Sequence, residues 1–239
     1  LKRDVLLANP LLDFSKILLV RRKSVNEGLP QNYESNSSLK NLHQMDDALM
    51  TLSLDQAKKS PGDIPLEMVF QTKKKYLGQV DLHFNADKIL FSSQEDKQLL
   101  PTAAPRWQIY EMDLKNRVPR AITGGQPEVD NYDACYMPSG KIAFTSTASF
   151  TGVPCLYGSP HVANLYIMDG DGKNIRQIGF DQDHSWSPSV LNNGRLIYQR
   201  WEYTDTPHTY ARLLFHCNPD GTNQVEYYGS NSYWPNAMF

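Results

Sequence analysis

Carboxylate, imidazole and thiol side chains gather in four segments of the sequence that lie between apolar runs. The segments are residues 128–133, 146–161, 181–186 and 201–208. Thiolate, imidazole and carboxylate together are a donor set that suits a transition metal, with zinc the simplest candidate. The candidate zinc ligands in these segments are Cys155, His161, Asp133, Asp183 and His184.

Each candidate also has a structural explanation, which the sequence leaves open. Aspartates that enter an inner strand commonly accept backbone N–H groups of a neighbouring sheet, which would account for Asp81, Asp133 and Asp183. Cys155 lies in an irregular segment six residues before His161, so ligation and simple packing are both open. No catalytic residue can be assigned from these patterns.

Three further residues are expected to pack and not to react. His83 and Cys135 are expected at equivalent positions of two inner strands, as buried polar packing residues. Cys217 aligns with methionines of other repeats and is expected in the core. The three cysteines form no Cys-x-x-Cys pair, which excludes a compact zinc knuckle and a disulfide-dense scaffold.

Composition excludes several classes of protein. The chain has 239 residues, 40% of them hydrophobic, which is enough for one large domain or two small ones. Its net charge is -2 with a pI near 6.3, and no basic run is longer than Lys73 to Lys75, so no nucleic-acid partner is expected. No window approaches eighteen apolar residues, so no membrane span is expected.

A repeated hairpin pattern predicts the architecture. An apolar residue, a turn, a basic residue and an apolar strand recur at residues 12–19, 84–91, 136–144 and 190–198. The basic residues, which are 72, 53 and 54 positions apart, are Lys16, Lys88, Lys141 and Arg195. Short turns of this composition join antiparallel strands, so each copy predicts a β-hairpin.

A second pair of strands is expected after each hairpin. The expected pairs are 48–54 with 64–71, 107–112 with 120–123, 164–168 with 176–178, and 212–217 with 224–228. Units with four strands each, repeated along the chain, are typical of β-propeller blades. One or two helical turns are expected at residues 3–8, before Pro10.

We therefore expect an all-β fold in which residues 1–239 form a partial β-propeller, a fragment with four complete four-stranded blades and the first strand of a fifth. The blades are expected at about residues 10–71, with an insertion at 23–47, and at 80–124, 132–179 and 186–229, while the fifth begins at 232–239. With strands named A to D from the axis outward, the B-to-C loops and D-to-A connections share one face, here called the loop face. The A-to-B and C-to-D turns form the opposite, hairpin face. All five candidate ligands belong to the loop face.

Several short strings of the sequence occur in a specific order. They include Asp81-Leu-His-Phe84, Tyr132-Asp-Ala-Cys-Tyr136, Gly152-Val-Pro-Cys155, Asp181-Gln-Asp-His184, Arg200-Trp-Glu-Tyr-Thr-Asp205 and Tyr228-Gly-Ser-Asn-Ser-Tyr-Trp-Pro235. Together they resemble the propeller region of the hydrazine synthase alpha subunit-like family, whose WD40-type repeats are of the TolB/PD40-like kind. The resemblance covers nearly the whole chain.

The resemblance implies a six-bladed propeller in an exported protein, in the periplasm or an equivalent compartment. It implies a haem-dependent oxidoreductase in which the propeller supports and walls a c-type haem site, with a zinc ion nearby that Cys155 helps to hold. This sequence has no Cys-x-x-Cys-His, so the haem and its chemistry would belong to regions outside the chain. The implied partners are the remaining blades and haem-binding regions of the parent protein, and other subunits.

Two other functions are compatible with the pattern. A TolB-like, non-catalytic binding module would dock a protein or a glycan through the loop face. A substrate-gating propeller of a serine peptidase is the third possibility, but no Gly-x-Ser-x-Gly nucleophile motif is present. A fold alone does not decide among these functions.

Overall fold

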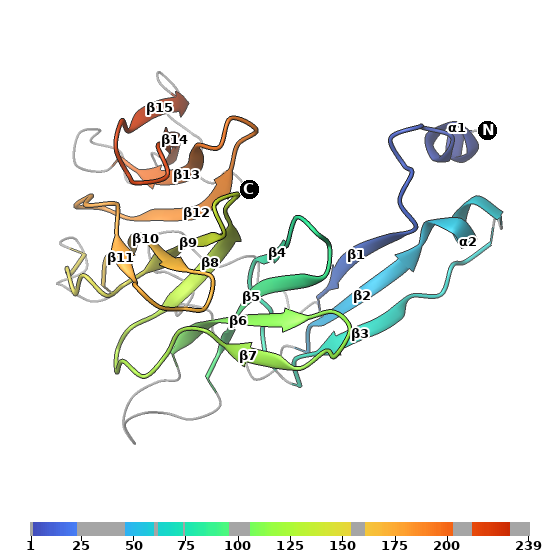
Figure 1. Ribbon diagram of the computed structural model, residues 1–239, viewed down its shortest axis with the longest axis horizontal. Helices are drawn as coiled ribbons and strands as arrows, with labels where there is room; N and C mark the ends of the chain where they lie inside the picture. Colours follow the sequence, from blue (N-terminus) through green and yellow to red (C-terminus); the bar gives the residue numbers. More distant parts are fainter. Residues whose placement is uncertain are drawn as a thin grey trace. The chain divides into compact units, whose positions relative to one another are not determined.

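The computed structural model describes residues 2–22, 46–59, 62–73, 75–95, 106–153, 161–202 and 212–229 (Figure 1). These residues divide into two compact units, one up to Leu77 and one from Gly78 onward, here called the N-terminal and C-terminal units. Both consist mainly of antiparallel sheets, so the expected all-β class is confirmed. Most of the predicted insertion at 23–47 and the predicted fifth blade at 232–239 lie outside the described residues.

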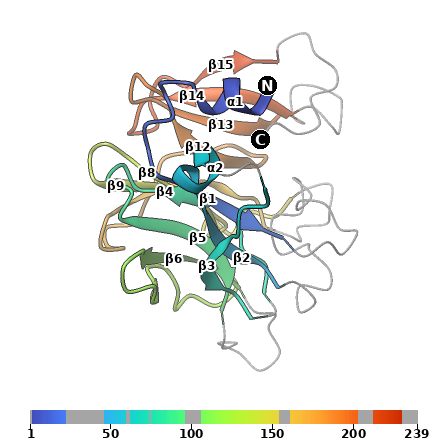
Figure 2. The same ribbon diagram turned by 90° about the vertical axis from the view of Figure 1, so that its right-hand side faces the viewer.

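The N-terminal unit contains two short helices and a sheet of three strands. In chain order its elements are α1 (Lys2–Leu7), β1 (Lys16–Arg21), β2 (Ala48–Ser53), α2 (Leu54–Lys59) and β3 (Glu67–Gln71). The strand order is β1-β2-β3 with antiparallel pairing, and β1, blue in Figure 2, lies at one edge.

No helix in the described part of the chain is long and apolar enough to cross a membrane.

The C-terminal unit contains three sheets, each a four-stranded antiparallel meander. The first consists of β4 (Val80–Leu82), β5 (Lys88–Gln94), β6 (Trp107–Asp113) and β7 (Pro119–Ala121). The second consists of β8 (Asn131–Tyr136), β9 (Lys141–Ser146), β10 (Asn164–Asp169) and β11 (Arg176–Gln177). The third consists of β12 (Ser185–Val190), β13 (Leu196–Trp201), β14 (Arg212–Cys217) and β15 (Val225–Tyr228). These strands lie within a few residues of the strands predicted from the repeat.

The three-stranded sheet of the N-terminal unit corrects the expectation that the first blade has four strands. Residues 8–15 form turns, where the repeat predicted the inner strand of a hairpin. The carbonyl of Leu12 accepts a hydrogen bond from Lys58 Nζ at 2.8 Å, and the carbonyl of Ser15 accepts the Leu54 N–H at 2.8 Å. Contacts with α2 therefore hold this segment, so it does not pair with β1.

Helix α2 was not predicted, although its sequence carries the usual signals of a short helix. Ser53 Oγ accepts the N–H of Gln56 at 3.3 Å, which caps the first turn. Leu54 and Ala57, three residues apart, are both buried, and two lysines occupy the last turn. A six-residue helix is too short to be identified by periodicity, so the sequence analysis assigned the region to a strand and a loop.

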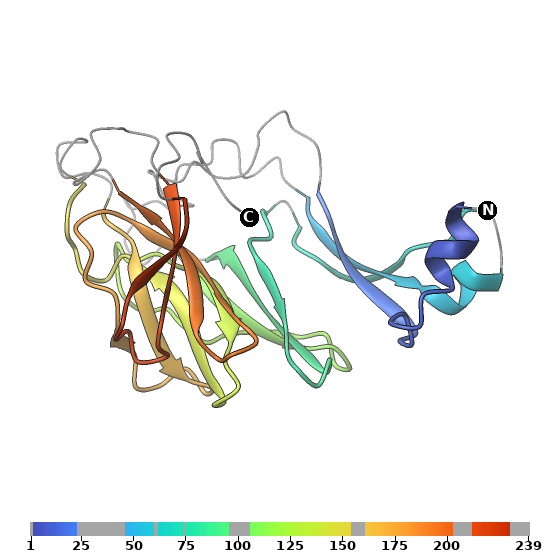
Figure 3. The same ribbon diagram turned by 90° about the horizontal axis from the view of Figure 1, so that it is seen from above.

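Apolar layers join the neighbouring sheets of the C-terminal unit, which stand face to face in Figure 3. Strand β9 contributes to both layers, because Ile142 and Phe144 face the first sheet and Ala143 faces the third. Burial on both faces explains the continuous apolar run of this strand, and full burial of one such side chain stabilises by about 1.5–3 kcal/mol. The remaining buried members of the layer between the first two sheets are Leu90, Ile109, Ile122, Ala134, Tyr136, Tyr166 and Met168.

A glycine in a C-to-D turn contacts the preceding sheet at two equivalent places. Gly172 has φ +87° and a Cβ there would lie 2.4 Å from the carbonyl oxygen of Ile122. Gly221 has φ +89° and its Cβ would lie 2.2 Å from the carbonyl oxygen of Ile178. Each turn therefore lies directly against the backbone of the sheet before it, and only glycine leaves room.

We expect Gly172→Ala and Gly221→Ala to reduce the free energy of unfolding more than Gly140→Ala, which tests this contact. All three residues have positive φ, a strain of roughly 1–2 kcal/mol for alanine, but a Cβ at Gly140 meets nothing within 4 Å. The backbone clash should add about 1–3 kcal/mol at the first two positions. Urea unfolding followed by tryptophan fluorescence measures the difference, and equal losses at all three positions would contradict the contact.

Candidate functional site

The loop-face end of the seam between the first two sheets of the C-terminal unit is organised by Asp130. Its Oδ1 accepts the backbone N–H of Trp107 at 2.9 Å, and Arg106 Nη1 lies 3.5 Å from its Oδ2. Burial raises the pKa of Asp130 above its ordinary value, and the N–H of Trp107, the charge of Arg106 and nearby His161 oppose that rise. Asp130 thus fixes the start of β6 against the connection that enters β8.

His184 has the same role at the next seam. Its Nδ1 accepts the N–H of Ala163 at 2.9 Å, just before β10, as Asp130 accepts the N–H at the start of β6. The carbonyl of His184 accepts the N–H of Trp201 at 2.9 Å, and the carbonyl of Asp130 accepts the N–H of Thr147 at 3.0 Å. Both residues immediately precede an inner strand, so they are structural equivalents in two repeats.

The ring of His184 is also part of a buried stack. It lies nearly parallel to Trp186, with centroids 4.6 Å apart, and to Trp201 at 5.8 Å. The guanidinium of Arg212 lies 4.7 Å from the Trp201 ring centroid. All four side chains are buried, so this stack joins the D-to-A connection to the ends of β13 and β14.

A second charged group lies near this stack. Arg200 Nη1 forms an ion pair with Asp181 Oδ1 at 3.0 Å, and Arg200 also pairs with Glu202. Asp181 Oδ2 accepts the hydroxyl of Ser185 at 2.8 Å. The loop face therefore uses its carboxylates to tie connections to strand ends.

Asp133 lies at a β-bulge of the inner strand β8, where the pairing with β9 shifts register. Its φ is +49°, and Ser187 occupies the equivalent bulge of β12 with φ +50°. Ser187 Oγ donates a hydrogen bond to Asp133 Oδ2 at 2.9 Å, which links two inner strands. For Asp81 the expected backbone contact with a neighbouring sheet is confirmed, since its Oδ2 accepts the N–H of Tyr136 at 2.8 Å.

Four of the five candidate zinc ligands lie in the described residues. Cys155 lies outside the described residues, His161 is half-buried with its ring 5.4 Å from that of Phe150, and Asp183 is buried. Nδ1 of His184 and Oδ2 of Asp133 are already engaged in seam contacts. In the described ranges no group of three His, Cys, Asp or Glu side chains could hold a metal ion.

The two described cysteines lie in the apolar layer between the second and third sheets. Burial raises the pKa of the Cys135 thiol well above its usual range and that of Cys217 to about 11. Both thiols stay protonated at neutral pH and act as small apolar side chains. The prediction that Cys217 belongs to the core is confirmed.

On the hairpin face, the basic residues that marked the repeat tie strand B to strand C. Lys88 Nζ lies 2.8 Å from Glu111 Oε1, and Lys141 Nζ lies 2.5 Å from Asp169 Oδ1. Arg195 has a similar role in the third sheet, where its Nη1 donates to Asn218 Oδ1 at 2.6 Å. The repeated basic residue is therefore explained by a structural contact.

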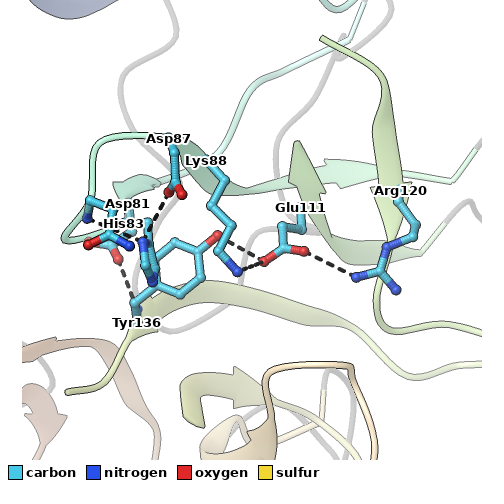
Figure 4. Close-up of polar contacts among 8 residues, drawn as sticks. Asp81, His83, Asp87, Lys88, Glu111, Arg120 and Tyr136 are labelled. Atoms are coloured by element: carbon cyan, nitrogen blue, oxygen red, sulfur yellow. Dashed lines mark hydrogen bonds and ion pairs between the residues drawn. The ribbon is translucent and has the colours of Figure 1, made fainter. Parts of the chain in front are cut away.

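The cluster around Glu111 goes beyond this pattern (Figure 4). Glu111 Oε1 also accepts the hydroxyl of Tyr136 at 3.1 Å, and Arg120 Nη2 lies 3.1 Å from Oε2. Burial alone would raise the pKa of Glu111, but Lys88, Arg120 and Tyr136 together lower it. Three donors from β5, β7 and β8 thus hold one carboxylate in its charged form across the seam.

His83 continues this cluster at the hairpin-face end of β4. Its Nδ1 lies 3.1 Å from Asp87 Oδ1, and its ring meets that of Tyr136 edge-on at 4.7 Å (Figure 4). The expected equivalence of His83 with Cys135 is wrong, because Leu82 and Tyr136 hold equivalent places opposite Ile89 and Ile142. The turn after β4 is one residue longer, which shifts the alignment.

No family model and no curated protein matches the sequence. Solved structures do match it. Hydrazine synthase of Kuenenia stuttgartiensis aligns with 90% of this chain and 32% of its own, at 13% identity and a TM-score of 0.64. TolB from Acinetobacter baumannii aligns with 76% of this chain and 37% of its own, at 14% identity and a TM-score of 0.53. A TolB-like protein from Agrobacterium tumefaciens aligns with 75% of this chain and 56% of its own, at 16% identity and a TM-score of 0.54.

The chain has a TolB-like β-propeller fold. At identities of 13–16% these structures establish the fold and no activity. The chain spans between 32% and 56% of the length of these three proteins. The sheets of the C-terminal unit are therefore propeller blades, here called the second, third and fourth blades in keeping with the repeat count.

Neither the Glu111 cluster nor the structural equivalence of Asp130 and His184 was predicted from the sequence. Glu111 lies at an ordinary strand position, and its partners come from three strands, so no local spacing marks it. A signal for the equivalence of Asp130 and His184 was present, since each residue lies two positions before the start of an expected blade, at residues 132 and 186. An aspartate carboxylate and a histidine ring nitrogen can each accept a backbone N–H, so the two residues are equivalent although their types differ. A comparison of repeats by residue type does not detect this equivalence.

We expect His184→Ala to destabilise the protein by about 2–4 kcal/mol, because it removes the acceptor for Ala163 and both ring contacts. His184→Asn keeps an acceptor and should recover part of this loss. Chemical unfolding of both variants, with zinc analysis of the purified proteins, provides the measurement. If either variant loses zinc without losing stability, His184 is a ligand and not a seam residue.

We expect Tyr136→Phe to cost more stability than Tyr166→Phe in the same apolar layer. Tyr136 donates to the carboxylate of Glu111, whereas Tyr166 donates to the neutral amide of Gln177 at 3.2 Å. Hydrogen bonds to charged groups contribute about 1.5–3 kcal/mol and neutral ones about 1 kcal/mol. Urea unfolding at neutral pH compares the two variants.

The same pair has an expected pH dependence. The pKa of Glu111 is lower in the folded chain, so its stabilisation is complete above the ordinary carboxyl pKa of about 4.3. It should disappear as the pH falls through the lowered value, and the excess cost of Tyr136→Phe should shrink with it. An excess cost that grows on acidification would contradict the ionised state of Glu111.

Proposed function

We propose that this chain is the propeller module of a larger, hydrazine synthase alpha subunit-like redox protein. The module contributes four blades of a six-bladed propeller and part of a fifth, and it scaffolds and walls a c-type haem site supplied by regions outside the chain. The observation that carries the proposal is the alignment with hydrazine synthase, which covers 90% of this chain at a TM-score of 0.64. The ordered sequence strings that resemble the same family support it independently.

The chemistry of the loop face supports a wall and not a reaction centre. Asp130, His184 and Arg200 are each engaged in contacts that hold connections and strand ends in place. A rigid surface whose polar groups are already paired can hold a neighbouring cofactor in position and exclude water from it. We therefore assign no catalytic residue to this chain, and the enzyme activity of the parent protein belongs to its other regions.

Two cofactors enter the proposal in different ways. Haem c supplies electron transfer in proteins of this kind, and without a Cys-x-x-Cys-His sequence this chain cannot attach it by thioether bonds. Zinc would depend on Cys155 and His161, because the described residues do not gather three suitable donors. The described part of the candidate set does not form a complete site, so no step of the mechanism is assigned to zinc.

The proposal includes a location and partners. We propose that the protein is exported to the periplasm or an equivalent compartment, on the basis of the family resemblance. Its partners are the remaining blades and haem-binding regions of the same protein, and other subunits of the complex.

The alternative is a TolB-like binding module that docks a protein or a glycan through the loop face. The two TolB-like structures, with TM-scores of 0.53 and 0.54, favour it. Exposed aromatic residues such as Phe150, which is 54% exposed at the loop face, would then contact the partner directly.

The proposal predicts that a positive charge added to the loop face changes the haem midpoint potential, whereas one added to the hairpin face does not. We expect the full-length parent protein to contain haem, measured by its pyridine haemochrome spectrum. Phe150→Lys on the loop face should raise the haem midpoint potential, because a nearby positive charge favours the reduced state. Redox titration followed by absorbance measures the shift.

Phe84→Lys is the matched control, because Phe84 is 63% exposed on the opposite, hairpin face. This variant should leave the potential unchanged. A parent protein without haem, or equal potentials in both variants, would overturn the scaffold proposal. Loss of binding to a protein or glycan partner in Phe150→Lys would then favour the alternative.

A further inference from the structure

His83 Nδ1 faces two partners that it cannot satisfy in the same protonation state. The backbone N–H of Asn85 donates to this nitrogen at 3.3 Å, which requires that Nδ1 carry no proton. Asp87 Oδ1 lies 3.1 Å from the same nitrogen, and an ionised carboxylate only accepts, so this contact requires a proton on Nδ1. A nitrogen within reach of both a donor and an acceptor exchanges one for the other when the ring gains a proton.

The permanent charges of the Glu111 cluster leave an excess of negative charge near His83 (Figure 4). The two cations of the cluster, Lys88 and Arg120, both pair with Glu111, at 2.8 and 3.1 Å. The other carboxylates beside the ring are Asp81 and Asp87. A proton on the ring therefore adds a positive charge where two carboxylates face it, and a neutral ring adds none.

Asp81 connects the charge of the His83 ring to the third blade. Its Oδ2 accepts the N–H of Tyr136, the last residue of β8, at 2.8 Å. Burial raises the pKa of Asp81, and the Tyr136 N–H and the charge of His83 oppose that rise. A positive charge on His83 thus favours the ionised carboxylate, which is the stronger acceptor for this N–H. The His83 ring also meets the Tyr136 ring at 4.7 Å, so the proton acts directly beside the neighbouring blade.

Solvent reaches the His83 ring, because 23% of its side chain is exposed. A proton can therefore enter and leave without unfolding of the seam. The Asn85 N–H lies at the surface, so water can replace the bond that this N–H loses when Nδ1 is protonated. The exchange of partners at Nδ1 is thus inexpensive on the Asn85 side and favourable on the Asp87 side.

His216 of the fourth blade has similar surroundings but lacks this choice. It is half-buried, and its ring meets that of Tyr227 edge-on at 5.5 Å. Its Nδ1 accepts Arg195 Nε at 2.9 Å, and a guanidinium only donates. A proton on this nitrogen would break the bond and bring two positive charges together. His216 is therefore a matched control for His83.

We propose that His83 is a pH-sensitive switch at the hairpin-face end of the seam between the second and third blades. When the ring is neutral, Nδ1 accepts the Asn85 N–H within the turn after β4. When the ring is protonated, Nδ1 donates to Asp87, and its charge strengthens the contact of Asp81 with Tyr136. The stabilisation is complete below the range in which histidine titrates and is lost as the pH rises through that range. This inference does not rest on the proposed function.

The pH dependence of unfolding tests the switch. His83→Asn keeps an acceptor for the N–H two residues further on, because asparagine Oδ1 forms the same turn contact, but it cannot be protonated. We expect the unfolding equilibrium constant of this variant, relative to that of the unchanged protein, to rise about 3–10-fold from about pH 8 to about pH 5.5. His216→Asn should show no rise. Urea unfolding followed by tryptophan fluorescence measures both ratios.

The same comparison in the Asp87→Asn background identifies the partner of the protonated ring. The rise on acidification should be smaller there, because the acceptor for the Nδ1 proton has lost its charge. A ratio for His83→Asn that stays constant or falls on acidification would overturn the proposal. An equal rise with and without the Asp87 carboxylate, or an equal rise for His216→Asn, would also overturn it. The haem content of the parent protein affects none of these ratios.

Discussion

The structure of the C-terminal unit depends on the contact between one blade and the next. Two apolar layers lie between the neighbouring blades, and the second strand β9 contributes alternate side chains to both. Directional contacts then fix each layer at its two ends. At the loop-face end the side chain before an inner strand caps the third strand of the preceding blade, through Asp130 in one seam and His184 in the next. A turn glycine adds a close backbone contact in both seams. Because these three contacts repeat, the angle between blades is set by the repeat itself.

This constraint explains the structural contacts of His184, one of the candidate zinc ligands, and of its equivalent Asp130. An aspartate or histidine beside an inner strand offers the acceptor that an otherwise buried N–H group requires, and leaving that group unpaired would cost about 1–3 kcal/mol. The bulge residues Asp133 and Ser187 make a different contact, a side-chain hydrogen bond that links two inner strands. The loop face is therefore polar mainly because strand ends and connections must be satisfied there.

Strand positions could be predicted because the repeat combines an apolar run, a turn and a basic residue, and each has a local cause. Lys88, Lys141 and Arg195 bind acceptors on or just after the third strand of their own blade, so the marker and the structure share one origin. The candidate site was harder to predict because its contacts join residues from neighbouring blades. The Glu111 cluster draws donors from β5, β7 and β8, and sequence spacing does not encode which side chains meet across a seam. The alignment of His83 with Cys135 failed for a smaller reason, a single extra residue in one turn.

The first blade shows where a repeat stops being a reliable guide. Its basic residue and apolar strand follow the pattern, yet the segment before them is held by α2, which no other repeat contains. A local hydrogen-bonding alternative therefore outcompeted hairpin formation, because two backbone acceptors found donors in the helix. Such an exception is informative because the sequence of β1 still carries the apolar run of a strand that is covered by neighbours. The regular blades of the C-terminal unit show what the pattern accompanies there, because each second strand pairs on both edges, with an inner strand and with a third strand.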